Sequence, residues 1–343
     1  MKRYLLPESG HFYKANLHCH TNCSDGRLSP EAVKEIYVRH GYSIIAFTDH
    51  DVFLRHDDLR DEHFLPLNGY EVEINREAQT YADTKTCHLC FISLDEANDT
   101  PVCWHRDAYL FAGALNHRYE VKNDESLPDY VREYTPDCIN DMIRLAREHN
   151  FFVTYNHPTW SVEGYETYSR YEGMNAMEMV NYGCVIEGYL ENNERVYDDF
   201  LRQGKRLYCI AADDNHCVYP EDSPHFDGCG AWTMISAPKL TYPDIADSLK
   251  NGYFYASTGP EIYSLFVEDG RLNITTSPAK KIVLTTGHRR AEIRYPKPDQ
   301  PLTGAVGDEA FYIKPGDKYV RVTVFDEHGE TADTNAYWVD ELL

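Results

Sequence analysis

Histidines and carboxylates recur where short apolar segments of this sequence end. The densest group lies in residues 16–26, where His18 and His20 are two residues apart and Asp25 follows them. The other segments lead to His50, Glu71, His88, His157, Asp214 and His216. Residues two apart on a strand face the same side, so His18 and His20 can bind one ion together. Mixed imidazole and carboxylate ligands suit zinc, manganese or iron, whereas calcium sites are built from oxygen atoms.

The ten cysteines are a second set of candidate ligands. Cys87 and Cys90 form a CxxC motif around His88, but residues three apart on a strand point to opposite faces, which disfavours a shared zinc or redox site. We expect Cys19 and Cys23 to pack beside the ligands rather than to bind metal. Because the sequence shows no export signal, we expect reduced thiols.

Seven apolar segments are predicted to be the strands that position these side chains. They lie at residues 13–18, 44–48, 64–70, 88–92, 151–155, 176–180 and 207–212. Helices are predicted between them: Ser29 and Pro30 begin one that Gly41 ends, Pro136 lies in the first turn of another, and a third surrounds Val196. This alternation predicts a parallel, barrel-like α/β domain. In such barrels the active-site residues gather at the C-terminal ends of the strands.

The length of the chain, 343 residues, exceeds one ordinary core and predicts a large domain plus a smaller one. We assign residues 1–258 to the barrel domain. Within it, residues 95–134 carry many Asp, Glu, Asn and Pro residues and are predicted to be an insertion or lid. In residues 259–343, period-two apolar stretches separated by turns predict a small all-β, sandwich-like domain.

The composition excludes several classes of function. A net charge of −23 and no basic stripe argue against nucleic acid as the main partner. No apolar run approaches the roughly 20 residues of a membrane span, and the first residues lack the apolar stretch of a signal peptide. We therefore expect a cytoplasmic protein with no membrane partner. The sequence leaves the oligomeric state open.

In order and type, five motifs of the chain resemble those of the PHP (polymerase and histidinol phosphatase) superfamily of metal-dependent phosphoesterases. They are HxH at 18–20 with SDG at 24–26, TDHD at 48–51, GYE at 69–71, NHP at 156–158, and DNH at 214–216 in place of the family's DxH. The resemblance covers roughly residues 14 to 220. It implies a distorted (β/α)7 TIM-like barrel that holds up to three metal ions.

The resemblance also implies how the ligands are divided among the metals. One ion is held by His18, His20, Glu71 and Asp214. Glu71 bridges to a second ion, which is also held by His157 and His88. A third ion is held by Asp25, His50 and His216. Many members of the family have a histidine at the position of Asp25, which implies a weaker third site, and His117 in the insertion is an alternative to His88.

We therefore expect a metal-dependent phosphoesterase with two or three divalent ions (Zn, Mn or Fe) that hydrolyses a small organic phosphate, with nucleotides among the candidates. The attacking group is expected to be a metal-bound water, and no side-chain base is assigned. Two alternatives stay open. The first is a metallohydrolase of carboxylic esters, amides or carbamates, because the same chemistry can attack a carbonyl. The second is a non-catalytic metal-binding scaffold.

Residues near the expected ligands supply further candidates. Asp51 and Asp213 either hydrogen-bond the far imidazole nitrogens or serve only the local turns, whereas Asp49 would point away from His50 on a continued strand. The candidate cations for binding substrate are Arg27, Arg118 and Lys122. For these three cations, a loop charge that only contacts solvent is the simpler interpretation.

Overall fold

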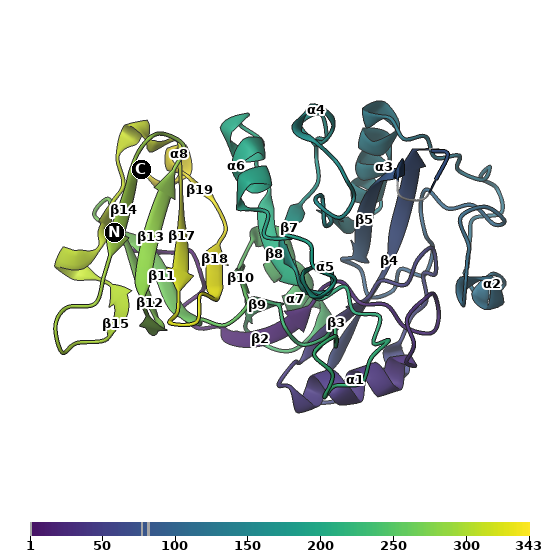
Figure 1. The fold of residues 1–343 in the computed structure, drawn as a ribbon, viewed down its shortest axis with the longest axis horizontal. Coiled ribbons are helices and arrows are strands. Elements are labelled where there is room, and N and C mark those ends of the chain that lie inside the picture. Colours follow the sequence, from purple (N-terminus) through teal and green to yellow (C-terminus); the bar gives the residue numbers. More distant parts are fainter. Residues whose placement is uncertain (1, 77, 81–82) are drawn as a thin grey trace.

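The computed structural model describes residues 2–76, 78–80 and 83–343. Its strands form one sheet of fourteen strands and one of five, with helices packed against the larger sheet (Figure 1). The chain therefore has a mixed α/β fold with large sheets. Across these residues, no helix combines the length and the apolar character that a membrane span requires.

The larger sheet contains the strands that carry the histidines. Its order is β14-β13-β17-β18-β10-β9-β2-β3-β4-β5-β6-β7-β8, and β19 pairs with β17. The strands of the histidine-bearing part are β2 (His11–Asn16), β3 (Ile44–Phe47), β4 (Leu65–Arg76), β5 (Lys85–Ser93), β6 (Phe151–Tyr155), β7 (Ala176–Asn181) and β8 (Tyr208–Ala212). All seven predicted strands are present. Two further strands, β9 (Trp232–Ala237) and β10 (Phe254–Ser257), had not been predicted.

The prediction that these strands are all parallel is wrong for β5, which runs antiparallel to both β4 and β6. Only residues 77–84 join β4 to β5, and a parallel crossover needs a dozen or more residues. As a result β4 continues past Glu71 to Arg76, and His88 lies near the start of β5 rather than at the end of a strand. The reversed direction of β5 still brings His88 to the same edge of the sheet, opposite Glu73.

The segments that follow β2 and β8, the first and last strands of this row, lie next to each other. Cys19, just after β2, forms a parallel bridge with Asn215, just after β8. The backbone N–H of His20 donates to the carbonyl of Asn215 at 3.0 Å, and that of Asp214 donates to the carbonyl of His18 at 2.9 Å. The HxH and DNH motifs, almost 200 residues apart in sequence, therefore lie side by side.

The helices of the described residues are α1 (Pro30–Arg39), α2 (Ala114–His117), α3 (Pro136–Glu148), α4 (Tyr165–Tyr168), α5 (Tyr182–Ile186), α6 (Glu194–Arg202), α7 (Tyr242–Asn251) and α8 (Val339–Leu342). Three helices were predicted, and α1, α3 and α6 correspond to them. The side chain of Ser29 accepts a hydrogen bond from the N–H of Ala32 at the start of α1, and Thr135 does the same for Cys138 in α3. Gly41 follows α1 with φ 79°, a conformation that glycine adopts at little cost.

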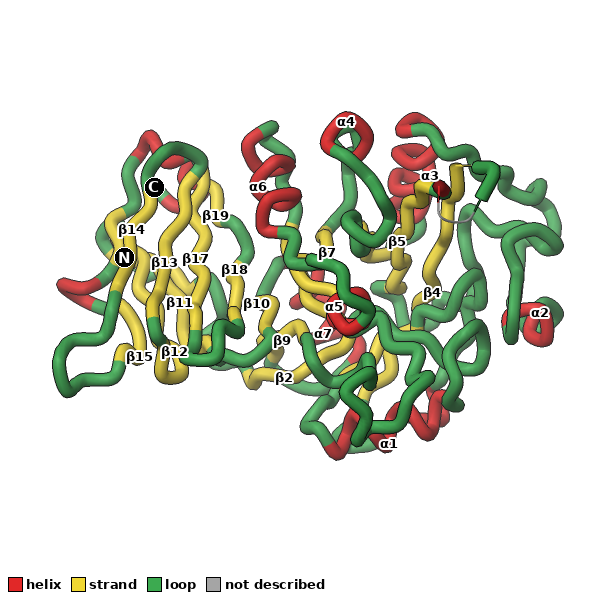
Figure 2. Tube along the Cα trace, in the orientation of Figure 1, coloured by secondary structure: helices red, strands yellow, loops and turns green. Residues whose placement is uncertain are grey.

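The C-terminal strands are β13 (Lys281–Thr286), β14 (Ala291–Arg294), β17 (Tyr319–Phe325), β18 (Thr331–Thr334) and β19 (Tyr337–Trp338) in the larger sheet. The smaller sheet contains β1 (Arg3–Tyr4), β11 (Ile262–Glu268), β12 (Arg271–Ala279), β15 (Leu302–Ala305) and β16 (Phe311–Tyr312). Figure 2 shows that strands dominate this end of the molecule, where both termini lie, while α1 and α3 lie toward the other end. A domain division at residue 258 stays a prediction.

The segment 95–134 packs onto the loops that follow β2 and β3. Its Trp104, Leu110, Ala114 and Val121 form a small apolar cluster with Cys23 and Val52. At its end, the buried guanidinium of Arg132 forms an ion pair with the buried carboxylate of Asp51, which directly follows His50. These contacts hold the segment next to the expected ligands.

Candidate metal centre

The predicted metal ligands lie together in one cluster. Seven of them are buried and two, Asp25 and His216, are partly exposed. Three groups have ligand atoms that all lie within 4.8 Å of one another: His18, His20, Glu71 and Asp214; His20, Asp25, His50 and His216; and His50, Glu71 and His88. His157 adjoins them, with its Nε2 3.4 Å from Oε1 of Glu71 and 3.7 Å from Oδ2 of Asp214.

In the first group, five of the six distances between the ligand atoms match the edges of a tetrahedral zinc site. Nε2 of His18 and Nε2 of His20 are 3.1 Å apart. Oδ1 of Asp214 lies 3.1 and 3.0 Å from these two nitrogens, and Oε2 of Glu71 lies 3.2 and 3.3 Å from them. A tetrahedron with such edges places its centre about 1.9–2.0 Å from each corner, close to the bond lengths of zinc to nitrogen and oxygen. The four side chains therefore fit a divalent ion.

One buried polar atom supports the same conclusion. Oδ1 of Asp214 is buried and makes no hydrogen bond in the structure, although Nε2 of His18 and Nε2 of His20 lie 3.1 and 3.0 Å from it. A buried polar atom without a partner is costly and rare in a folded protein. For Oδ1 of Asp214, an ion at the centre of the first group would supply the missing partner.

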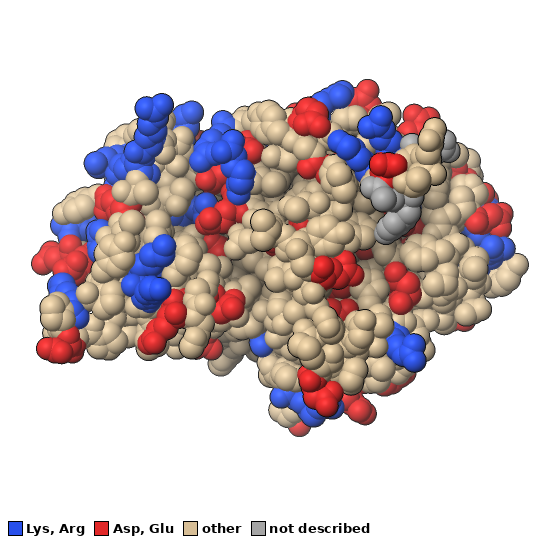
Figure 3. Space-filling model, viewed as in Figure 1, with Lys and Arg blue, Asp and Glu red and all other residues tan. Residues whose placement is uncertain are grey.

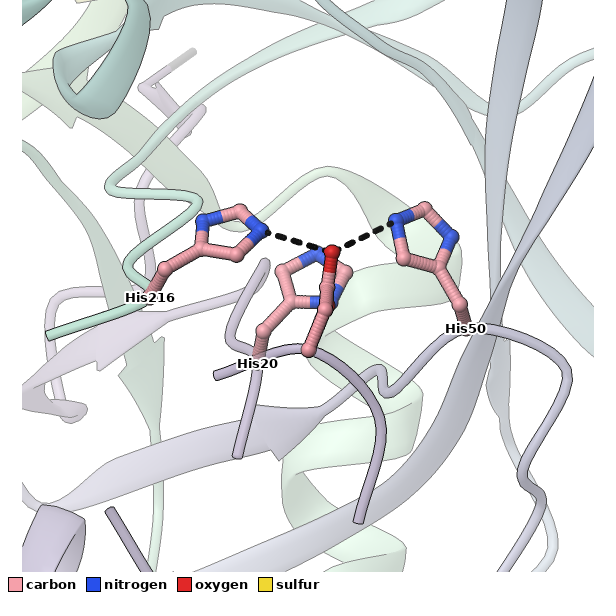
Figure 4. Close-up of side chains that lie close together, drawn as sticks. His20, His50 and His216 are labelled. Atoms are coloured by element: carbon pink, nitrogen blue, oxygen red, sulfur yellow. Dashed lines mark ion pairs between the residues drawn. The ribbon is translucent and has the colours of Figure 1, made fainter. Parts of the chain in front are cut away.

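The second group surrounds Asp25. Oδ2 of Asp25 lies 3.4 Å from Nε2 of His216 and 3.9 Å from Nε2 of His50. In Figure 4 these two imidazoles approach from opposite sides, with His20 between them. The rings of His20 and His216 are stacked, with their centroids 4.5 Å apart. His20 is therefore a member of both the first and the second group.

Glu178, which sequence reasoning missed, orients the first imidazole. Its Oε1 accepts a hydrogen bond from Nδ1 of His18 at 2.7 Å, which leaves Nε2 free to face the centre of the first group. Its Oε2 accepts bonds from the backbone N–H of His157 and from the side chain of Asn181, both at 2.9 Å. In the sequence, Glu178 is the only acidic residue of the apolar strand Ala176–Asn181. A buried carboxylate requires hydrogen-bond partners, and this is the signal by which Glu178 could have been found.

Other imidazoles are held by local partners. Nδ1 of His157 lies 3.1 Å from the hydroxyl of Ser161, and Nδ1 of His216 donates to the carbonyl of its neighbour Asp214 at 3.0 Å. His157 and Asp214 both have positive φ, 26° and 53°. Such conformations cost about 1–3 kcal/mol each and persist where surrounding contacts hold them.

The suggestion that Asp51 and Asp213 orient imidazoles is wrong, because both carboxylates are engaged elsewhere. Asp51 pairs with Arg132. Asp213 accepts bonds from the hydroxyl of Tyr37 and from the backbone N–H groups of residues 229–231, and burial raises its pKa to about 6. Asp49, as expected, contacts no imidazole and instead accepts bonds from Thr21 and Ser24.

Opposite charges inside the cluster set its protonation. Burial lowers the pKa of His18, but the carboxylates of Asp214 and Glu71 outweigh burial and hold this pKa well above its usual range. Burial raises the pKa of Glu71, but His18 and His88 outweigh it and hold this pKa well below its usual range. Without metal, protonated imidazoles therefore neutralise the carboxylates. A divalent ion would have to displace these protons.

Two of the three candidate cations are paired with carboxylates of their own segment. Arg118 pairs with Asp107 at 3.2 Å, and Nζ of Lys122 lies 2.5 Å from Asp99 within the same segment. The side chain of Arg27 is exposed, while its backbone N–H donates to the carbonyl of His216 at 2.8 Å.

The alternative ligand His117 lies in α2, where its Nδ1 is 3.3 Å from Glu120. It is not a member of the three groups formed by the described residues, whereas His88 is. The ten cysteines, all described, are free, and Cys87 and Cys90 lie in β5 as expected. The structure thus brings His88, rather than His117, to the other candidate ligands.

Comparison with known proteins finds likeness in three-dimensional structure. A two-domain protein of Bacteroides vulgatus, which contains a predicted PHP-like metal-dependent phosphoesterase, is 17% identical over 98% of both chains, with a TM-score of 0.45. A protein of Bifidobacterium adolescentis, proposed to be a metal-dependent phosphoesterase, is 16% identical over 63% of this chain and 90% of its own, with a TM-score of 0.39. An amidohydrolase of Chromobacterium violaceum, with bound sulfate and no metal, is 16% identical over 62% of this chain and 91% of its own, with a TM-score of 0.40.

No protein-family model matches the chain, and a search of curated proteins finds no match. The descriptions of the first two neighbours name the type of enzyme that the sequence motifs resemble. Identities of 16–17% and TM-scores below 0.5 carry no functional argument of their own. The argument about function therefore depends on the side chains of the cluster.

Proposed function

We propose that this protein is a metal-dependent phosphoesterase that hydrolyses a small organic phosphate at a centre of two or three divalent ions. The observation that carries the proposal is the first group, in which the ligand atoms of His18, His20, Glu71 and Asp214 all lie within 4.8 Å of one another, five of the six distances being 3.0–3.3 Å. Zinc, manganese and iron all accept such nitrogen and oxygen ligands.

The proposed ligand sets share residues, so their ions would be neighbours. Glu71, His20 and His50 each belong to two of the three groups. The first ion is assigned to His18, His20, Glu71 and Asp214. The second is assigned to Glu71, His88 and His157, and the third to Asp25, His50 and His216. Bound side by side, divalent ions lower the pKa of water and offset the charge of a phosphoryl group.

The chain's own residues have defined parts in this proposal. Glu178 keeps a proton on Nδ1 of His18 and so fixes which nitrogen faces the centre. Ser161 is placed to do the same for His157. No side chain is assigned as the general base. Arg27, Arg118 and Lys122 stay candidate contacts for the substrate, with Arg118 and Lys122 first requiring release from their carboxylate partners.

The proposal includes a fold assignment. Residues 1–258 would form a distorted (β/α)7 TIM-like barrel, in which the contact between the segments after β2 and β8 supports closure. Residues 95–134 would be an insertion beside the active site, and residues 259–343 a small all-β domain. In a barrel of this type the ligands belong at one end of the strands, where loops converge.

The test is a panel of chromogenic phosphomonoesters, phosphodiesters and carboxylic esters, assayed with manganese, zinc or iron after removal of metal by a chelator. The proposal predicts metal-dependent release of phosphate that is lost in His20→Ala. Hydrolysis of carboxylic esters alone, also lost in His20→Ala, would point instead to a carbonyl-directed metallohydrolase. Metal binding without turnover of any ester would indicate that the protein is a non-catalytic metal-binding scaffold.

A further inference from the structure

Two partly exposed aromatic side chains lie directly against the candidate ligands. The ring of Phe111, from segment 95–134, lies 5.1 Å from that of His50, and 36% of Phe111 is exposed. The indole of Trp160, from the loop after β6, lies 5.4 Å from the ring of His88 and 5.1 Å from that of His157. The rings of His50 and His88 are themselves 5.5 Å apart. The two aromatic rings therefore flank the group formed by His50, Glu71 and His88.

Trp160 is held in place by one buried and one exposed carboxylate. Its backbone N–H donates to Oε2 of Glu191 at 2.8 Å, and Glu191 is fully buried. Its indole N–H donates to Oε2 of Glu187 at 3.2 Å. Both glutamates belong to the segment that follows β7. Because its backbone and its ring are each bonded, Trp160 has little freedom to turn away from the histidines.

Phe111 is held by close docking of its segment onto the loop that carries the first ligands. The backbone N–H of Gly113 donates to the carbonyl of Ser24 at 2.6 Å. A methyl group on Gly113 would lie 2.3 Å from the carbonyl oxygen of Asn22 and 2.5 Å from that of Ser24. Only glycine permits this approach, and it brings Phe111 to His50.

The chemistry of the surroundings indicates what these rings contact. The candidate cations Arg118 and Lys122 are paired with carboxylates of their own segment. Glu187 and Glu191 lie beside Trp160. In Figure 3 the centre of the face, where Figure 1 places α5, is mainly tan and red. These features favour a neutral, flat group on the substrate over a second anionic one.

We propose that Phe111 and Trp160 are specificity-determining walls that select phosphate monoesters of alcohols carrying a planar aromatic group. This inference depends on the proposed function. Hydrolysis would break the phosphorus–oxygen bond of the ester. The hydroxyl of water goes to phosphorus and the proton to the departing alcohol, while the aromatic group of the alcohol packs against these rings beside the metal centre. Contacts between aromatic rings prefer offset or edge-to-face arrangements, which two rings on separate loops can supply.

The test compares benzyl phosphate with n-butyl phosphate, whose alcohols have similar acidity, on metal-loaded protein. We expect kcat/KM to be at least about ten-fold higher for benzyl phosphate, as aromatic contacts of this size imply. Phe111→Leu and Trp160→Leu should each lower kcat/KM for benzyl phosphate about five-fold more than for butyl phosphate. Tyr119→Leu removes a ring of the same segment that is 90% exposed, and it serves as the matched control with an unchanged ratio.

A binding measurement separates recognition from turnover. Calorimetric titration with benzylphosphonate and butylphosphonate should show the same preference, and the same loss of preference in the two wall variants. Equal kcat/KM for both esters, or equal losses for both in the variants, would overturn this inference while the phosphoesterase proposal stands. No phosphate release from either ester by protein that holds its ions would overturn both.

Discussion

Glu178, in the middle of β7, accepts a hydrogen bond at 2.7 Å from Nδ1 of His18, in the loop after β2. Because a carboxylate can only accept here, His18 keeps a proton on Nδ1, and when a metal ion displaces the proton on Nε2 it is this nitrogen that offers a lone pair to the ion. The two residues are 160 positions apart in sequence. Glu178 of β7 thus determines which nitrogen of His18 is able to bind metal.

Glu178→Gln tests this relationship. Its amide group can turn a nitrogen toward His18, so the preferred tautomer and the basicity of the ring are both lost. We expect metal affinity to fall about ten- to hundred-fold, as is typical for partners that orient metal ligands. Competition titration with a chromogenic chelator measures this. The exposed Glu172→Gln serves as the control, and an affinity unchanged in Glu178→Gln would show that the bond does not orient His18.

The metal-free protein should lose stability as the pH rises from about 6.5 to about 9. Burial lowers the pKa of His157, but Glu71 and Asp214 outweigh burial and raise this pKa to about 9. A histidine whose pKa is raised by folding stabilises the fold fully below its unfolded value, 6.5, and loses that contribution as the pH rises through 9. A bound divalent ion replaces the proton, so metal-loaded protein should lack this decline.

Thermal unfolding of metal-free and metal-loaded protein at a series of pH values measures this difference. His157→Gln should flatten the curve of the metal-free protein. Titration calorimetry in buffers of different ionisation enthalpy should also show protons released when metal binds below pH 9. Parallel pH curves for the two forms, or metal binding without proton release, would contradict the account.

The buried ion pair between Asp51 and Arg132 should be important for stability. Asp51 has φ 56°, a conformation that asparagine also adopts, so Asp51→Asn removes the charge with little backbone strain. The guanidinium of Arg132 is then left buried without its counter-charge. We expect a loss of about 3–5 kcal/mol in the free energy of unfolding. Urea denaturation measures it.

The exposed pair of Lys122 and Asp99, in the same segment, provides the control. Asp99→Asn should cost at most about 1 kcal/mol, since exposed pairs contribute little. In the double variant Asp51→Asn/Arg132→Met, much of the loss should be recovered because no unpaired charge remains. A loss in Asp51→Asn no larger than in Asp99→Asn would show that the buried pair does not fix the segment.

Gly113→Ala should disturb the docking of segment 95–134. The added methyl group would overlap two backbone oxygens in the loop 22–24, which cannot move without displacing the first ligands. We expect a loss of about 1–3 kcal/mol on urea denaturation, typical of overpacking. Gly316→Ala is the matched control, because nothing lies within 4 Å of the added methyl group. Equal stability of the two variants would contradict the close contact.

The sequence identified local elements well because their signals are local. Ser29 caps α1 and Pro136 lies in the first turn of α3, as predicted. The prediction of a parallel β5 is wrong because the link between Arg76 and Lys85 is shorter than a parallel crossover requires. That reversal explains why His88 reaches the ligand cluster from the beginning of its strand.

The predicted ligands could be found because their residue types stand out beside apolar strands. The residues that orient them could not be found in the same way. Glu178 is identified only when β7 is placed beside the loop of His18, and Trp160 only when the loop after β6 is folded against His88. Such contacts depend on tertiary packing, which one sequence does not reveal.

The most direct measurement of the central claim is the anomalous scattering at the metal absorption edge from crystals of the metal-loaded protein. The account predicts two or three peaks within the cluster. One should lie at equal distance from Nε2 of His18, Nε2 of His20, Oε2 of Glu71 and Oδ1 of Asp214. Crystals grown with excess metal that show no peak at this point would contradict the account.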